Sequence, residues 1–178
     1  DPLRSHVESQ RAYYEWTRRE DGMRIPLIDA AFAWLEEHWP AEPSPTVLGW
    51  GDARIGNIVF DGCTPAAVLD WEMATIGPRE LDLGWFIFLH RFFDEITTDL
   101  GMAGLPDFLA RDWVVSRYTE LTGHEPRDLA RFEAYAALRH GTVMTRAMRR
   151  RVLFGEIEMP DDPEELILHR AALERMCS

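Results

Sequence analysis

The chain contains no lysine, so all nineteen of its basic residues are arginine. Acidic residues number 31, and the formal net charge at pH 7 is −12. Such a surplus of negative charge repels phosphate backbones and anionic lipid surfaces, so we expect neither nucleic acid nor a membrane as a partner. Long apolar runs are missing as well. No stretch of eighteen apolar residues occurs, which excludes an ordinary membrane-spanning helix.

Cysteine is scarce. Its two copies, Cys63 and Cys177, lie 114 positions apart, without the short spacing of a metal site. This usage is typical of reduced thiols in a cytoplasmic protein, which is the compartment that we expect. The six histidines show no H-E-x-x-H motif or other short pairing, which argues against a zinc site. A G-x-S-x-G motif is also missing, so a serine-hydrolase mechanism is not indicated.

What the chain does contain is enough apolar material for a core: 46% of its 178 residues are apolar and 11% aromatic. We therefore predict one domain over residues 1–178, of α+β class and mostly helical. Periodicity and helix-boundary signals predict helices over residues 3–20, 26–38, 79–94, 106–122, 127–150 and 163–176. Gly123 would end the fourth of these, and Asp161 or Asp162 would cap the last. Pro40, Pro43 and Pro45 predict a loop, which Val47-Leu48 follows as a brief strand.

Two of the predicted helices have distinctive surfaces. Residues 79–94 are apolar nearly all round, which is typical of a buried central helix. Residues 127–150 carry a stripe with spacings of three and four, made of Leu129, Phe132, Ala136, His140, Val143 and Ala147. An arginine run ends this helix, at positions 146, 149, 150 and 151. It is either a solvated end that complements the helix dipole, or a docking patch for a phosphorylated or carboxylated substrate.

The most informative polar residues are Asp52, Asn57 and Asp70. Asn57 follows Asp52 by five positions, and Asp70 follows Asn57 by thirteen. The intervening segment predicts a hairpin, with strands near 58–60 and 66–69 and a turn at Asp61-Gly62. Folding of that hairpin returns Asp70 to the neighbourhood of Asn57. Carboxylate and amide oxygens of this kind suit Mg²⁺, which also binds substrate phosphates. The spacing of Asp52 and Asn57 is also that of a phosphoryl-transfer catalytic loop.

These residues make the chain similar to the aminoglycoside phosphotransferase family of kinase-like enzymes, whose signature is H-G-D-x-x-x-x-N, a hairpin and D-x-E. It most resembles the branch found joined to, or acting beside, acyl-CoA dehydrogenases. The matching residues are Gly51, Asp52, Arg54, Asn57, Val68-Leu69-Asp70-Trp71-Glu72, Gly77-Pro78 and Asp82-Leu83. The resemblance implies the large C-terminal lobe of a protein-kinase-like fold, in which a small β-hairpin carries the catalytic and metal residues.

The resemblance also implies roles for four residues. Asp52 would orient the acceptor hydroxyl and accept its proton, and Arg54 would neutralise charge on the transferred phosphate. Asn57 and Asp70 would bind Mg²⁺ and, through it, ATP. Alone, Asp52, Asn57 and Asp70 would more simply be turn, loop and strand-end residues, and Arg54 would form a surface ion pair with an acidic residue. It is their combined spacing that favours the functional interpretation.

Three further residues are expected to support the site. Asp82 would accept hydrogen bonds from the backbone of the catalytic loop. Glu72 would bind a second metal or form an ion pair with an arginine. Trp50 stands where the family has histidine, and we predict that it holds the loop by packing.

Neither a glycine-rich loop nor a lysine precedes the motif, and the chain begins with Asp1-Pro2. Kinase-like enzymes cover the nucleotide with a small lobe that carries both features. The resemblance therefore implies that an N-terminal nucleotide-binding lobe is absent from this chain and would pack against it.

The leading hypothesis is an ATP-dependent kinase that transfers the γ-phosphate to the hydroxyl of a small-molecule acceptor, either a hydroxylated metabolite or an aminoglycoside-like compound. The alternative is a non-catalytic binding or scaffolding module derived from a kinase lobe, for which Trp50 and the missing lobe speak. Metal-dependent hydrolysis by the same carboxylates is a third hypothesis. It is weaker because few acids converge and no histidine joins them.

Overall fold

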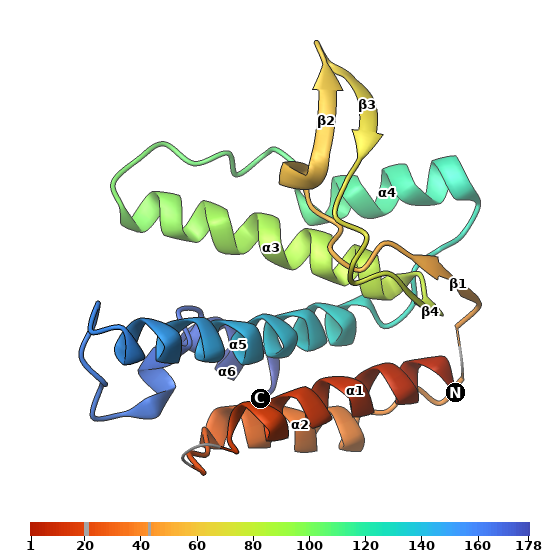
Figure 1. The fold of residues 1–178 in the computed structure, drawn as a ribbon. Coiled ribbons are helices and arrows are strands. Elements are labelled where there is room, and N and C mark those ends of the chain that lie inside the picture. Colours follow the sequence, from red (N-terminus) through yellow and green to blue (C-terminus); the bar gives the residue numbers. More distant parts are fainter. Residues whose placement is uncertain (20–21, 43) are drawn as a thin grey trace. The chain divides into compact units, whose positions relative to one another are not determined.

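The computed structural model describes residues 1–19, 22–42 and 44–178. Its fold is α+β and mostly helical, with small antiparallel sheets, as the sequence predicted (Figure 1). Pro43 and Glu20, which fell in a predicted loop and a predicted helix, lie outside the described residues. The contacts divide the chain into two compact units. One comprises residues 1, 3–41 and 134–178, and the other comprises residues 2 and 42–133.

The first unit is helical. It contains α1 (Pro2–Thr17), α2 (Pro26–Glu37), most of α5 (Leu129–Leu153), the 3₁₀ turn η2 (Pro163–Leu166) and α6 (Arg170–Met176). The carboxylate of Asp1 caps α1 by accepting a hydrogen bond from the Arg4 N–H, and Pro26 occupies the first turn of α2 as predicted. The most deeply buried large side chains of this unit include Tyr14, Ile25, Ile28, Phe32, Leu138, Leu166, Ile167 and Leu173.

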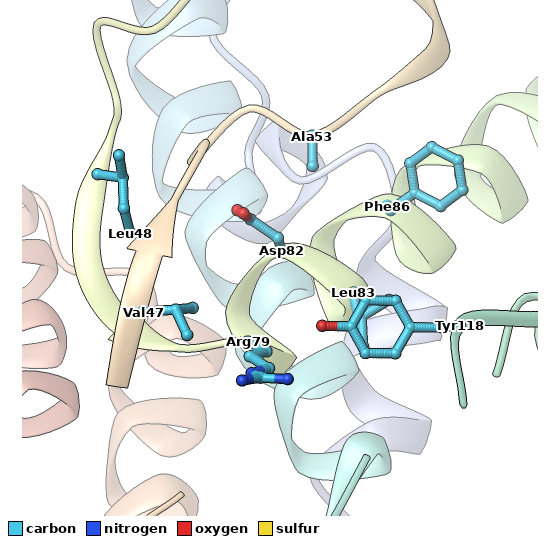
Figure 2. A pocket seen from close by; sticks show the side chains of 8 residues that line it. All are labelled: Val47, Leu48, Ala53, Arg79, Asp82, Leu83, Phe86 and Tyr118. Atoms are coloured by element: carbon cyan, nitrogen blue, oxygen red, sulfur yellow. The ribbon is translucent and has the colours of Figure 1, made fainter. Parts of the chain in front are cut away.

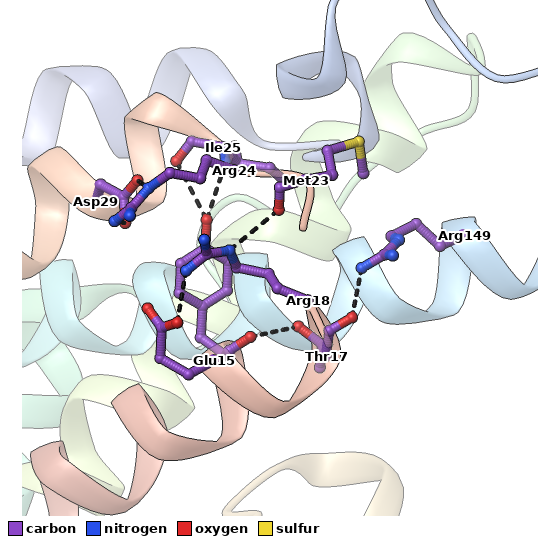
Figure 3. A network of polar contacts seen from close by, with 9 residues as sticks. Glu15, Thr17, Arg18, Met23, Arg24, Ile25, Asp29 and Arg149 are labelled. Atoms are coloured by element: carbon purple, nitrogen blue, oxygen red, sulfur yellow. Dashed lines mark hydrogen bonds and ion pairs between the residues drawn. The ribbon is translucent and has the colours of Figure 1, made fainter. Parts of the chain in front are cut away.

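Polar contacts join α1 to the residues just before α2 (Figure 3). The buried Tyr14 hydroxyl accepts a hydrogen bond from the Ile25 N–H at 2.8 Å. The Arg18 guanidinium donates to the Met23 carbonyl, and Arg24 forms a two-point ion pair with Asp29. The first two contacts satisfy backbone groups of Met23 and Ile25, in the residues that lead into α2.

Two details of the first unit correct the sequence prediction. Residues 163–176 form η2 and α6 rather than one helix, because Ile167 is extended and the Nε2–H of the buried His169 donates to the Ala137 carbonyl at 2.8 Å. Asp162 caps η2, as expected of one of the two aspartates. In α5, Val143 and Ala147 are exposed, so the predicted stripe fails in the second half of the helix.

The buried face of α5 continues instead through Thr142 and Thr145. Their hydroxyls donate to the carbonyls of Leu138 and Gly141 in the preceding turn, at 3.0 and 2.8 Å. Because each hydroxyl is satisfied within its own helix, threonine can occupy the buried face without a partner elsewhere. A search for apolar residues alone could not find this face.

The second unit carries the strands. It contains β1 (Thr46–Gly49), the 3₁₀ turn η1 (Ile55–Asn57), β2 (Ile58–Asp61), β3 (Thr64–Val68), β4 (Thr75–Pro78), α3 (Glu80–Asp99), α4 (Arg111–Thr122) and the first residues of α5. The predicted hairpin is confirmed as β2 and β3, which pair antiparallel with an irregularity between Val59 and Phe60. A second antiparallel pair, β1 with β4, was not predicted.

The helices of this unit follow the prediction with shifted boundaries. Helix α3 is largely buried, as expected, and extends to Asp99. Helix α4 begins at Arg111, because Pro106 lies in a preceding turn, and Gly123 ends it with a left-handed φ of 68°. Among the described residues, no helix is both long enough and apolar enough to cross a membrane.

Candidate functional site

The loop from Trp50 to Asn57 joins β1 to the hairpin and carries the predicted site. Its sharp bend requires glycine at position 51, where φ is 90° and a Cβ atom would lie 2.0 Å from the Met73 carbonyl oxygen. The bend presents Asp52 between the hairpin and α3, and η1 then delivers Asn57 to the first strand of the hairpin.

Three donors converge on the Asp52 carboxylate. The Trp85 indole N–H donates to Oδ1 at 2.8 Å, while the Asn57 amide and the Arg54 guanidinium donate to Oδ2 at 2.7 and 3.0 Å. Only 13% of the Asp52 side chain is exposed. Burial raises the pKa of Asp52, but the hydrogen bonds from Trp85, Arg54 and Asn57 outweigh it and hold the pKa below its usual value. Asp52 is therefore an ionised, oriented acceptor at neutral pH.

Asn57 is buried and bridges the ends of the loop. Its amide nitrogen donates to the Asp52 carboxylate and, at 3.2 Å, to the Asp52 backbone carbonyl. Because the donors of the amide are used in this way, its oxygen is the atom that could ligate a cation. The Asn57 carbonyl accepts from the Leu69 N–H at 2.8 Å, which ties the far end of the hairpin to the loop.

Asp70 follows Leu69 directly, so the hairpin brings it back to the loop as the sequence predicted. It is exposed and has a left-handed φ of 60°, a conformation that is costly for a residue with a Cβ atom. The carboxylate oxygens of Asp70 and the amide oxygen of Asn57 are hard ligands that fit Mg²⁺. Among the described residues, no group of three or more His, Cys, Asp or Glu side chains could hold a metal ion by itself.

Asp82 fastens the loop to α3. Its two carboxylate oxygens accept from the N–H groups of Trp50 and Gly51, at 2.6 and 2.8 Å. These are hydrogen bonds of the kind that the sequence analysis expected of this residue. Trp85 lies one helical turn further along α3, so the same face of one helix holds both the loop backbone and the Asp52 side chain.

Trp50 corrects a prediction. It was expected to hold the loop by packing alone, but its indole N–H donates to the Leu69 carbonyl at 2.7 Å. Its ring also lies 6.2 Å from that of Trp71, whose own indole N–H donates to Val68. A tryptophan in place of histidine can thus still supply a hydrogen-bond donor to this part of the chain. Glu72 is exposed and takes no part in these contacts within the described residues.

Sequence reasoning missed Trp85, which it assigned to the core only. The only signal in the sequence is general: a buried indole N–H needs an acceptor, but the sequence does not say which carboxylate supplies it. The structure thus brings Asp52, Arg54, Asn57, Asp82 and Trp85 into one hydrogen-bonded cluster.

A cavity of about 340 Å³ adjoins the loop in the same unit (Figure 2). Its lining is mostly apolar and consists of Val47, Leu48, Ala53, Arg79, Asp82, Leu83, Phe86 and Tyr118. Ala53 follows Asp52 directly, so the cavity begins one residue from the candidate catalytic carboxylate. The buried Nε of Arg79 has no hydrogen-bond partner among the described residues.

Comparison with known proteins agrees with this geometry. A model of the phosphotransferase enzyme family matches residues 2–121. Acyl-CoA dehydrogenase family member 10 of Mus musculus is 28% identical over 113 residues, which are 55% of this chain and 10% of that protein. Acyl-CoA dehydrogenase family member 11 of Homo sapiens is 35% identical over 82 residues, which are 43% of this chain and 10% of that protein.

A solved structure from Ralstonia eutropha JMP134, with the provisional description of an aminoglycoside phosphotransferase, matches with a TM-score of 0.69 and 22% identity. The match covers 99% of this chain and 54% of that chain. The chain therefore spans about half of that structure and a tenth of the curated relatives, and the structural likeness concerns the fold. The family resemblance found in the sequence, including the likeness to acyl-CoA dehydrogenase relatives, is confirmed.

Proposed function

The chain belongs to the phosphotransferase enzyme family, and on this premise we propose that it carries the catalytic loop of a kinase that phosphorylates a hydroxyl of a small molecule. The single observation that carries the proposal is the Asp52 carboxylate, which three side chains orient and keep ionised. Preorganised groups of this kind are the main source of catalysis in phosphoryl transfer.

Each residue of the cluster has a part in this proposal. Asp52 accepts a hydrogen bond from the acceptor hydroxyl and aligns its oxygen with the phosphate. Arg54, whose side chain is 38% exposed, can donate to the transferred phosphate as well as to Asp52. Asp82 and Trp85 keep the loop and the carboxylate in place.

Asn57 and Asp70 would hold Mg²⁺ and, with it, ATP. Their amide and carboxylate oxygens fit the ion, and the Leu69–Asn57 hydrogen bond keeps the two residues close along the hairpin. When bound there, Mg²⁺ supplies positive charge that offsets the charge of the nucleotide phosphates.

The cavity beside Ala53 suggests a class of acceptor. Its lining is mostly apolar, and the one cation among the described lining residues, Arg79, stands beside one carboxylate, Asp82, whose oxygens already accept from the N–H groups of the loop. Such an environment disfavours a polycationic aminoglycoside. The curated relatives are named as acyl-CoA dehydrogenase family members. We therefore favour a hydroxylated acyl compound or a similar metabolite as the acceptor.

We also propose that a nucleotide-binding lobe of the whole protein packs on the hairpin. Large apolar side chains are exposed there: Val59, Phe60, Val68, Leu69 and Trp71 are each at least 40% accessible. Large apolar side chains exposed together on one hairpin are typical of a surface that contacts another surface. Protection of the β2 and β3 amides from hydrogen exchange in the full-length protein, lost in Phe60→Ser, would be the expected signature.

The test of the function is Asp52→Asn in the full-length protein, assayed for transfer of the γ-phosphate of ATP to a panel of hydroxylated acyl compounds and sugars. We expect the rate to fall by roughly 10²–10⁴-fold, because the amide cannot accept the hydroxyl hydrogen bond as an anion does. The matched control is Asp61→Asn, which changes an exposed aspartate at the end of β2, beside the turn of the same hairpin. A rate equal to that of the control would exclude the proposed mechanism.

The second candidate is a non-catalytic binding module. Arg54 and Asn57 both occupy Oδ2 of Asp52, an arrangement that would also serve to lock the loop in one conformation. An Asp52→Asn protein that binds nucleotide and acceptor as the wild type does, while neither protein transfers phosphate, would favour this function.

A further inference from the structure

A second cavity, of about 460 Å³, lies in the first unit, where the end of α1 meets the last turns of α5 and the segment after it. Its lining consists of Trp16, Thr17, Arg19, Arg146, Arg149, Arg150, Val152, Leu153 and Met159. Among the described lining residues, four are arginine and none is acidic. In a chain with a net charge of −12, such a concentration of positive charge is unusual.

We call this hollow the arginine cavity. Two of its arginines, Arg146 and Arg149, are held in place by contacts with α1 and the residues at its end. The Arg149 guanidinium donates to the Thr17 carbonyl at 2.6 Å, and so joins α5 to the end of α1 (Figure 3). The Arg146 guanidinium lies 4.7 Å from the Trp16 ring centre and donates to the Tyr13 hydroxyl. Side chains held in this way lose little freedom when a ligand arrives, which favours binding.

The other two arginines are placed to meet a ligand. Arg19 and Arg150 are both exposed, and the Arg150 guanidinium lies over the Phe154 ring at 5.4 Å. A guanidinium has five N–H donors in a planar fork, which matches the oxygens of a phosphate or a carboxylate. Arg19 comes from the segment after α1 and Arg150 from α5, so the two can contact one anion from different elements.

The cavity also has an apolar side. Trp16 is 46% exposed, Met159 44% and Leu153 78%, and the half-buried Val152 completes this side of the lining. Water covers these surfaces in the free protein, and burying them against an apolar group is favourable. The combination of an arginine cluster and an apolar wall matches a molecule with an anionic head on an apolar body.

A purely structural explanation covers only part of this pattern. Arginines at the end of α5 complement the negative end of the helix dipole. That effect, however, requires neither Arg19, which belongs to a different element, nor a hollow between the two elements. An anionic membrane surface is also a poor match, since the net charge of −12 opposes it.

We propose that the arginine cavity binds a small soluble molecule that carries a phosphate or carboxylate group on an apolar body. The site lies within the first unit and does not depend on the phosphotransferase function proposed for the Asp52 loop. A phosphorylated or acidic metabolite of this kind would be a second ligand of the protein.

The test uses isothermal titration calorimetry on the full-length protein with octyl phosphate, below the concentration at which it forms micelles. Inorganic phosphate and octanol are the comparison ligands. We expect octyl phosphate to bind more tightly than either, because only it offers both the anion and the apolar chain. In the double variant Arg19→Gln/Arg150→Gln, its affinity should fall by about tenfold or more, as for the loss of charge-assisted hydrogen bonds.

The matched control is Arg151→Gln. Arg151 is also exposed at the end of α5, but it pairs with Glu156 at 3.2 Å and does not line the cavity. Its variant should bind octyl phosphate as the wild type does. Equal affinities of the double variant and the control would overturn the proposal, as would no binding of octyl phosphate. Binding to phosphatidylserine vesicles in place of octyl phosphate would also overturn it and would assign the arginines to a membrane.

Discussion

Single side chains decide the shape of the Asp52 loop. The two carboxylate oxygens of Asp82 accept hydrogen bonds from the successive N–H groups of Trp50 and Gly51. The indole N–H of Trp85 donates to Asp52. Both residues come from one face of α3, which is otherwise apolar. A rigid helix therefore positions the loop, and flexible surface residues have little part in it.

We expect Asp82→Asn to destabilise the protein by about 2–4 kcal/mol, because an amide can accept at one oxygen only and leaves one buried N–H without its charged partner. Phosphotransfer should fall with it, since the loop would lose its fixed orientation. Chemical denaturation measures the stability change. The control is Asp99→Asn at the exposed end of α3, for which no change beyond about 0.5 kcal/mol is expected.

Sequence spacing placed Asp52, Asn57 and Asp70 correctly along the hairpin, because strand pairing converts sequence distance into spatial proximity. The partners of Asp52 were harder to predict. Trp85 lies 33 positions from Asp52, and only the packing of α3 brings the two together. Trp50 was predicted to pack, and its hydrogen bond to Leu69 depends on a hairpin register that the sequence does not specify. The catalytic and metal-binding roles of these residues stay predictions.

At the level of elements, the sequence predicted the hairpin and the main helices but missed β4. The segment Thr75–Pro78 contains glycine and proline, which read as a turn, and it becomes a strand only because β1 offers a partner. The break between η2 and α6 was missed for a similar reason. It depends on the burial of His169 beside Ala137, a tertiary contact that helical periodicity does not reveal.

The approach of α3 to the start of α5 gives a prediction at this level. A Cβ atom at Gly84 would lie 2.6 Å from the Phe132 backbone, whereas one at Gly141 would meet the end of the Ile28 side chain at 3.3 Å. Because backbone cannot move aside as a flexible side chain can, we expect Gly84→Ala to cost more than about 2 kcal/mol. Gly141→Ala should cost less, because the end of the Ile28 side chain can move aside, and the gain of roughly 1 kcal/mol from alanine in a helix then offsets the remaining strain.

The two melting temperatures, compared in thermal unfolding of otherwise identical proteins, measure this difference. If Gly84→Ala lowered the melting temperature less than Gly141→Ala does, α3 and the start of α5 would not pack as closely as the structure has them.

For the molecule as a whole, buried histidines predict how stability depends on pH. Burial, with a further effect of the Arg139 charge, lowers the pKa of His6 to about 4, and burial lowers the pKa of His169 despite its hydrogen bond to Ala137. Each side chain therefore binds its proton at a lower pH in the folded protein than in the unfolded chain, whose histidines titrate near pH 6.5. The free energy of unfolding should therefore fall as the pH decreases from 6.5 towards 4.

Because the pKa of His6 falls from 6.5 to about 4 on folding, His6 alone accounts for about 2–3 kcal/mol of this loss between pH 7 and pH 4.5. Urea denaturation at pH 7 and at pH 4.5 measures it. The His6→Gln protein, which keeps a polar group beside the Tyr135 hydroxyl, should show a much flatter dependence. A wild-type protein equally stable at both pH values would contradict the burial of a neutral His6.

The most direct test of the proposed function is the Mg²⁺-dependent affinity of the full-length protein for ATP, measured by calorimetry for the wild type, Asp70→Asn and the control Asp61→Asn. If Asp70 holds the metal with Asn57, Asp70→Asn should weaken ATP binding in Mg²⁺ by at least about tenfold, as for the loss of a charged ligand. Asp61→Asn should leave it unchanged. Equal affinities in all three proteins would contradict a nucleotide site at the hairpin.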